Sequence, residues 1–432
     1  MDSSLQSEGL VAPSRCLSRQ VTRRRSAASL AIAAMLIVAL VAPATLAQTP
    51  STPSPAAAAL EKAVAAEPAD AVLTYFLAVV RAQSGDPGGA LAALEQTLQR
   101  GNGFLPPDDI FESLGASPQF QDLQAQYARK LPRVVTGNVV ATMSDPLLIP
   151  EGLAYDGAER VLYVGSIARR GIYRIGGRGK LEPLSAPTDE LDAVLGLAID
   201  ERGRKLYAVS TSALTSAGRS RPRNAVVVYD LRTGRRERAY LIPGATQLND
   251  VAIGDGFILA TDSAAGGVWR VALADGNVDA VVPMGRAPGA NGIALAGNGH
   301  AYVAANRRPL RLDLGTGEVT PLRLPPREQA AAIDGLYWHD GYLVGIQNVT
   351  TRGRVVRLAL AADGTTVSRV ETLQSHHQPA FFQPTTAAPA ADGLYVLTRT
   401  YVTRFDADGK IAGVDTVRPA QVLRIPWPAS GS

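Results

Sequence analysis

The chain has 432 residues, of which 46% are hydrophobic and 19% charged, a composition that excludes a disordered protein and favours a globular one. Its net charge is +4, and five arginines and two acidic residues within residues 1–47 account for +3 of it. The remaining charge of about +1 is too small for a nucleic-acid-binding surface. The one cysteine, Cys16, lies in the same stretch, which excludes disulfides and thiolate metal sites from the rest of the chain.

Residues 1–47 have the three parts of an export signal. Arg23, Arg24 and Arg25 precede an apolar, alanine-rich run that ends in small residues at Ala47. We therefore expect a signal peptide cleaved near Ala47, a periplasmic or secreted protein, and no membrane attachment after cleavage. An uncleaved membrane anchor is the alternative, because the run is nearly long enough to span a bilayer. The arginines leave the general secretory and twin-arginine routes both open.

A Pro/Ser/Thr-rich linker over residues 48–55 leads into a helical region over residues 56–131. Apolar residues recur there three and four positions apart, and Glu-Pro and Gly-Asp-Pro turns separate the runs. This order of helices and turns resembles one tetratricopeptide unit. Because a single unit cannot bury its apolar face alone, we expect it to pack on the rest of the chain or on a protein partner.

A short phrase then recurs six times: a first residue that is polar in five of the six copies, an apolar or small run, a turn, and a second apolar strand. The first residues of the six copies are Glu151, Leu195, Asn249, Asn291, Asp334 and Thr385. Their spacing of about 40 to 55 residues is that of a four-stranded propeller blade. The sequence therefore predicts an all-β, six-bladed β-propeller over residues 134–428, preceded by the small α-helical segment. The spare β-run at 134–143 is predicted to supply the outer strand of the last blade.

The innermost strand of each blade lines the central channel, so the first residues of the phrases should converge on the axis. Four of them carry oxygen ligands, namely Glu151, Asn249, Asn291 and Asp334. Buried carboxylates are costly unless they are paired or bound to metal. An oxygen-only set predicts one divalent cation, Ca²⁺ first, with Zn²⁺, Mn²⁺ or Mg²⁺ as alternatives. The competing interpretation is that Asn-Gly, Asn-Asp and Asp-Gly are only hairpin turns.

These phrases resemble the senescence marker protein, gluconolactonase and luciferin-regenerating enzyme family, with paraoxonases and strictosidine synthase-like proteins as more distant relatives. The resemblance rests on Pro150-Glu151-Gly152-Leu153, Leu248-Asn249-Asp250, Ala290-Asn291-Gly292-Ile293 and Asp334-Gly335-Leu336. It implies that Glu151, Asn291 and Asp334 hold the metal. It also implies that Asn249 lies beside the metal and contacts substrate or water, and that Asp250 contacts either the residues around the metal or the substrate. The tryptophan that follows the glutamate in the family is absent, and Tyr155 stands near that position.

The resulting prediction is an exported metal-dependent hydrolase of a small lactone or ester. Asp334 is the candidate general base and Asn249 orients the substrate. His376 and His377, in the loop between the fifth and sixth blades, are further candidates for lining the substrate pocket. The chain has no Gly-x-Ser-x-Gly sequence, which argues against a covalent serine route. The alternative is a non-catalytic periplasmic binding or scaffold propeller with a structural calcium ion.

Overall fold

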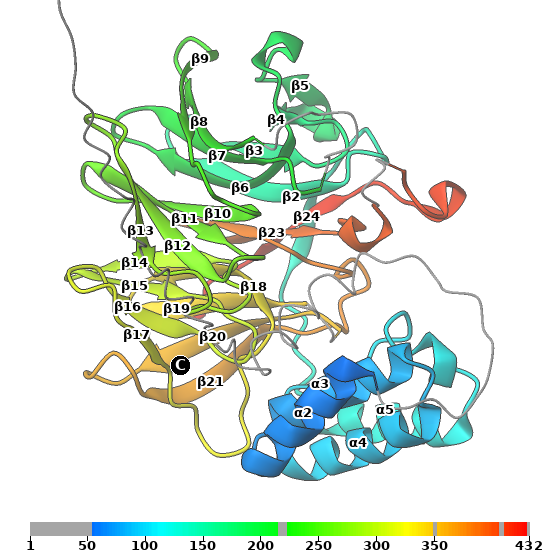
Figure 1. Ribbon diagram of the computed structural model, residues 1–432. Helices are drawn as coiled ribbons and strands as arrows, with labels where there is room; N and C mark the ends of the chain where they lie inside the picture. Colours follow the sequence, from blue (N-terminus) through cyan, green and yellow to red (C-terminus); the bar gives the residue numbers. More distant parts are fainter. Residues whose placement is uncertain (1–53, 215–222, 349–351, 406–409, 430–432) are drawn as a thin grey trace, which may run out of the picture.

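The computed structural model describes residues 54–214, 223–348, 352–405 and 410–429. Figure 1 shows a disc of β-sheets with a group of helices packed beside it. The predicted signal peptide and most of the predicted linker lie outside the described residues. Within the described ranges, no helix is long and apolar enough to cross a membrane.

The helices occupy residues 55–130, which we call the helical segment. They are α2 (Pro55–Ala66), α3 (Ala71–Gln83), α4 (Pro87–Arg100), the 3₁₀ turn η1 (Glu112–Leu114) and α5 (Pro118–Lys130). The side chains of Asp70 and Asp86 accept backbone hydrogen bonds in the first turns of α3 and α4, and α4 begins with a proline. Helix α3 is buried almost all round and forms the centre of this segment. Its likeness to a tetratricopeptide unit stays a prediction.

The rest of the described chain forms six four-stranded antiparallel sheets. The first two blades are β2 (Pro150–Asp156), β3 (Val161–Ser166), β4 (Gly171–Ile175) and β5 (Leu181–Pro183), then β6 (Ala193–Asp200), β7 (Lys205–Thr211), β8 (Asn224–Asp230) and β9 (Arg235–Leu241). The third and fourth are β10 (Leu248–Ile253), β11 (Phe257–Asp262), β12 (Gly267–Ala272) and β13 (Val278–Val282), then β14 (Ile293–Gly297), β15 (His300–Val303), β16 (Leu310–Asp313) and β17 (Val319–Pro321). The fifth is β18 (Ile333–His339), β19 (Tyr342–Gln347), β20 (Arg354–Leu360) and β21 (Val367–Gln374). The sixth is β22 (Ala387–Ala390), β23 (Gly393–Thr398), β24 (Gln421–Ile425) and β1 (Asn138–Thr142), and short 3₁₀ turns lie at η2 (Gly177–Gly179), η3 (Pro187–Asp189), η4 (Val402–Arg404) and η5 (Val414–Thr416).

The sixth blade joins the two ends of the propeller, because its strand order is β1-β24-β23-β22. Asn138 of β1 faces Arg424 of β24 in the antiparallel register. The inner strands also contact each other in sequence, and β22 contacts β2 to close the circle. The predicted six-bladed propeller is confirmed, and so is the prediction that the first β-run becomes the outer strand of the last blade.

Sequence signals explain the repeated hairpins and the packing between blades. At the β8–β9 turn, Asp230 accepts backbone hydrogen bonds from Arg232 and Thr233, and Gly234 adopts a φ of +67°. The same arrangement recurs at the β16–β17 turn around Asp313. Alternating apolar residues of neighbouring blades form shared cores between the sheets.

Glycines allow the inner strands to approach one another around the axis. A Cβ added at Gly152 would clash with the backbone carbonyl of Leu195, and one at Gly292 would lie 2.5 Å from the carbonyl oxygen of Asp334. Both glycines follow directly after the polar first residue of their repeat. This close approach brings the first residues of several blades together.

Candidate functional site

The predicted site residues lie where the inner strands of the propeller begin. Glu151 is the second residue of β2, Asp334 the second of β18, and Asn249 and Asp250 follow the first residue of β10, while Asn291 lies just before β14. Glu151, Asn249, Asp250 and Asp334 are 7%, 8%, 9% and 5% exposed. The six-fold arrangement therefore buries polar side chains at one end of the central channel.

The two carboxylates Glu151 and Asp334 are close enough to affect one another. Burial raises the pKa of Glu151 well above its usual value, and the charge of Asp334 raises it further. Burial also raises the pKa of Asp334 to about 7, although hydrogen bonds from Asn348 and Asn291 act to lower it. Within the described residues neither carboxylate forms an ion pair with a lysine or an arginine. The channel thus brings together two carboxyl groups whose charged forms no described cationic side chain stabilises.

The oxygen atoms of this cluster fit a hard cation. Among the described residues, Glu151 Oε2, Asp334 Oδ1 and Asn348 Oδ1 are buried and have no hydrogen-bond partner. Unsatisfied buried carboxylate and amide oxygens are the ligands that Ca²⁺ takes. No three His, Cys, Asp or Glu side chains of the described ranges lie together at metal-binding spacing. A cation held here would therefore be bound by two carboxylates and by neutral amide oxygens.

Asp250 is engaged in holding two inner strands together. Its carboxylate accepts hydrogen bonds from the backbone amides of Val251 (2.9 Å) and of Ile293 (3.1 Å), which follows Asn291 in the next blade. Burial raises the pKa of Asp250 to about 7, against the lowering effect of these two bonds. Its predicted contact with substrate, and that of the neighbouring Asn249, stay predictions.

Asn348 is a channel residue that the sequence analysis did not select. Its side-chain amide donates to Asp334 Oδ2 (2.6 Å) and to the carbonyl oxygen of Pro384, in the loop that leads to β22. Asn348 follows β19, the second strand of its blade, so it stands outside the repeated phrase at the start of each inner strand. Nothing in the sequence pattern distinguishes it from an ordinary loop asparagine.

Tyr337 was also missed as a polar residue of the channel. Its hydroxyl accepts a hydrogen bond from the backbone amide of Ala387 (2.6 Å) across the seam between the fifth and sixth blades. Burial raises the pKa of Tyr337 well above its usual value, and the charges of Asp250, Asp334 and Glu151 raise it further. Tyr337 occupies an apolar position of the repeated phrase, so the sequence pattern does not indicate that its hydroxyl lies in the channel.

His376 and His377 follow Ser375, which contacts Val134 in the segment between α5 and β1. Their rings are 4.0 Å apart between centroids, and Nδ1 of His377 is 2.8 Å from Oγ of Ser375. Ser375 in turn hydrogen-bonds Val134 through both its backbone amide and its hydroxyl. Burial lowers the pKa of His376 to about 4, and the neighbouring charges of His377 and Arg352 lower it too. Their predicted place in a substrate pocket stays a prediction.

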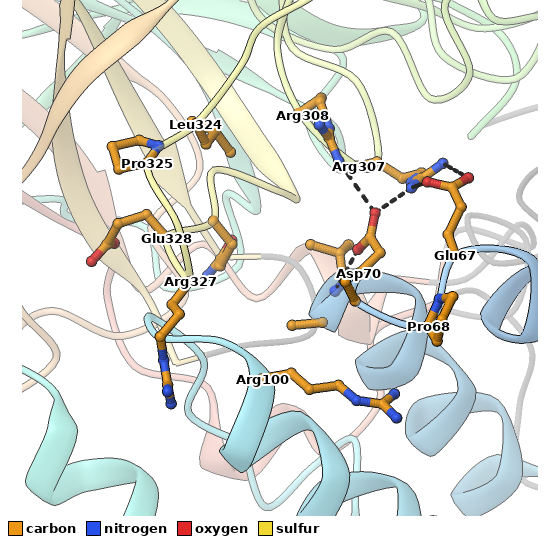
Figure 2. A pocket seen from close by; sticks show the side chains of 14 residues that line it. Glu67, Pro68, Asp70, Arg100, Arg307, Arg308, Leu324, Pro325, Arg327 and Glu328 are labelled. Carbon is orange, nitrogen blue, oxygen red and sulfur yellow. Dashed lines mark hydrogen bonds and ion pairs between the residues drawn. The ribbon is translucent and has the colours of Figure 1, made fainter.

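A concave site lies between the helical segment and the propeller. It has a volume of about 350 Å³ and is lined by residues from α3, its preceding turn and the loops before β16 and β18. Figure 2 shows Arg307 and Arg308 reaching from the propeller to Asp70. Arg307 also pairs with Glu67. These ion pairs cross from one part of the chain to the other, so this pocket belongs to their interface.

No family model matches this chain, and neither does any curated protein. Solved structures with a similar fold include regucalcin, a calcium-binding protein from Agrobacterium tumefaciens, at 17% identity and a TM-score of 0.44, covering 68% of this chain and 96% of that one. A protein described as a putative gluconolactonase has 17% identity and a TM-score of 0.44, and the match covers 72% of this chain and 96% of that one. The PQQ-bound aldose sugar dehydrogenase of Streptomyces coelicolor has 18% identity and a TM-score of 0.47, with 68% and 99% covered.

Proposed function

We propose that the protein is a calcium-dependent hydrolase of a small lactone or ester. Its centre is the group of Glu151, Asn249, Asn291, Asp334 and Asn348, which we call the channel cluster. The observation that carries this proposal is the set of three buried oxygens, from Glu151, Asp334 and Asn348, that have no hydrogen-bond partner. Two buried carboxylates without a cationic side chain are costly, and a bound cation removes that cost. The resemblance of the inner-strand phrases to the gluconolactonase family supports the choice of reaction.

Each residue of the cluster has a defined part in this proposal. Glu151, Asp334 and Asn291 hold the cation, and Asn348 contributes its free oxygen. When bound, a divalent cation at this position supplies Lewis acidity toward an ester carbonyl. Asn249 orients the substrate, and Asp334 accepts a proton from the attacking water. The amide of Asn348 fixes the direction of the Asp334 carboxylate through their hydrogen bond.

A non-catalytic binding propeller is the second candidate. The helical segment contacts the same face of the disc at which the channel cluster lies, which is an arrangement suited to a scaffold as well as to an enzyme. In that case the cation holds the blades together and has no open coordination position. Export through the predicted leader is part of both proposals and rests on residues 1–47 alone.

The deciding experiment measures cation content and hydrolysis together. We would titrate the purified protein with Ca²⁺ and Zn²⁺ by calorimetry and assay a panel of lactones and aryl esters. Asp334→Ala is the test variant, and Asp255→Ala, at an exposed aspartate of the β10–β11 turn, is the matched control. Binding and turnover lost only in Asp334→Ala support the hydrolase. Binding without turnover favours the binding propeller, and no cation binding by the unmodified protein contradicts both.

A further inference from the structure

The helical segment rests on the face of the propeller at which the inner strands begin. The backbone amide of Asn102 donates to the carbonyl of Arg327 (2.7 Å), in the loop that precedes β18. The backbone amide of Arg352, between β19 and β20, donates to the carbonyl of Leu105 (3.0 Å). In antiparallel blades, the loop before the first strand and the loop after the second lie at the same edge of the sheet. This is also the edge that carries Asp334.

The interface is fixed by ion pairs and by shared core packing. Asp70, whose side chain is 8% exposed, pairs with both Arg307 and Arg308 of the propeller. Ala331, in the loop before β18, belongs to the apolar core of the helical segment. Partly buried charge pairs and an apolar contact therefore hold the helical segment against this face of the propeller.

A buried polar network lies directly beneath this interface. It consists of Gln329, Gln347 and Arg354, which are 2%, 0% and 6% exposed. Arg354 donates to Gln347 Oε1 (2.7 Å) and to the carbonyl of Gln329 (3.2 Å), and Gln347 donates to Gln329 Oε1 (2.9 Å). Burial lowers the pKa of Arg354 to about 10. The charge of Glu328 acts to raise this pKa, and the buried guanidinium also depends on its hydrogen bonds to neutral groups.

The network touches the helical segment on one side and the channel on the other. Gly103 packs against Arg354, so that an added Cβ would lie 2.8 Å from Cζ of that arginine, and its φ of +88° also requires glycine. In the β18–β19 register Gln347 pairs with Ile333, which is the residue directly before Asp334. Gln347 also immediately precedes Asn348, which holds the Asp334 carboxylate. A series of contacts and adjacent residues therefore runs from Gly103 through Arg354, Gln347 and Asn348 to Asp334.

We propose that the helical segment is a fixed cap, and that the network of Gln329, Gln347 and Arg354 transmits its docking to Asn348 and Asp334. The three network side chains are positioning residues, because they act through Asn348 and Asp334. The consequence for cation affinity rests on the proposed function. Loss of residues that orient metal ligands weakens metal binding by roughly 10- to 100-fold, so we expect calcium affinity to fall about tenfold when the network is disturbed.

The test compares two variants of the full chain that disturb the network from opposite sides. Gly103→Ala adds a methyl group against Arg354, and Arg354→Met removes the buried charge while keeping an unbranched chain. Gly88→Ala, a position in α4 with open space around its Cβ, is the control. Circular dichroism verifies that each variant keeps its fold, and if Gly103→Ala does not fold, Arg354→Met still provides the comparison.

Hydrogen exchange of residues 333–335 and 347–348 is the deciding measurement. We expect these amides to exchange at least several-fold faster in Gly103→Ala and Arg354→Met, with β6 unchanged and Gly88→Ala like the unmodified protein. Unchanged exchange in both folded variants would overturn the proposal. Calcium titration of the same samples measures the expected tenfold loss. If the unmodified protein binds no calcium, the proposed function fails, and the exchange comparison still decides whether the cap and the channel are coupled.

Discussion

The side-chain amide of Asn348 lies 2.6 Å from Oδ2 of Asp334, and it also reaches the carbonyl of Pro384. One amide therefore joins the inner strand of the fifth blade, the end of its second strand and the loop that enters the sixth blade. Because both amide hydrogens point to these acceptors, Oδ1 of Asn348 is left as a buried oxygen without a partner. Asn348 thus has an acceptor available for a cation while it fixes a carboxylate ligand.

Asn348→Ala is expected to weaken calcium binding about tenfold and to lower the free energy of unfolding of the cation-free protein. Removing one partner of a buried hydrogen bond costs about 1–3 kcal/mol. Calorimetric titration and urea denaturation check the two effects. Asn277→Ala, at an exposed hairpin asparagine, is the control. Equal calcium affinity in Asn348→Ala and the unmodified protein would show that Asn348 has no part in the site.

Gly152→Ala is expected to destabilise the propeller. The added Cβ would lie 2.9 Å from the carbonyl carbon of Leu195, a backbone atom that cannot move away cheaply. Forcing extra atoms into a close-packed region costs about 1–3 kcal/mol or more. The measurement is the free energy of unfolding in urea. Gly177→Ala has open space around its Cβ and should be near neutral, so similar losses in both variants would argue against the close approach of the inner strands.

Arg204→Ala is expected to be one of the most destabilising changes outside the channel. Arg204 pairs with both oxygens of Asp156, whose side chain is fully buried, between the first and second blades. Removing one partner of a buried pair costs about 3–5 kcal/mol because an uncompensated charge remains. Adding Asp156→Asn to Arg204→Ala should therefore recover part of the loss. The control is Arg232→Ala at an exposed turn, and thermal denaturation that shows no recovery in the double variant would contradict this account.

Docking of the helical segment is expected to weaken in acid. Burial alone would raise the pKa of Asp70, but the hydrogen bond and charge of Arg307 outweigh it and hold the pKa below its usual 3.8. A carboxyl group with a lowered pKa in the folded state contributes stability above its unfolded pKa and loses it as the pH falls through the folded value. The stability difference between the unmodified protein and Asp70→Asn should therefore shrink below pH 3.8. Urea denaturation from pH 6 to pH 3 measures it, and a difference that stays constant would exclude the ion pair as the cause.

The blades were predictable because each repeat combines a local strand pattern with a local turn. The aspartate and glycine of the β8–β9 turn illustrate this, since Asp230 and Gly234 specify that hairpin without help from distant residues. Glu151 and Asp334 could be proposed as neighbours because equal positions in a closed ring of repeats must converge. Their burial and their mutual effect on pKa agree with that reasoning.

Contacts that depend on how the ring and the helices pack could not be predicted. Asn348 reaches Asp334 from a loop after β19, so it is absent from the repeated phrase. The hydrogen bonds from the backbone amides of Val251 and Ile293 to Asp250 were not predicted, and the contact of Asp250 with substrate stays a prediction. Docking of the helical segment depends on single residues such as Gly103, whose role appears only when Arg354 lies against it.

The pairing of β1 with β24 sets the order in which the molecule can be completed. β1 is the first strand to leave the ribosome and β24 is the last, so the hydrogen-bonding groups of β1 have no native partner until almost the whole chain has been made. The helices, which precede β1, can form on their own contacts well before then. A polypeptide that stops before β24 therefore leaves β1 and β23 without the strand that pairs with both of them, and its sixth blade cannot form the four-stranded sheet.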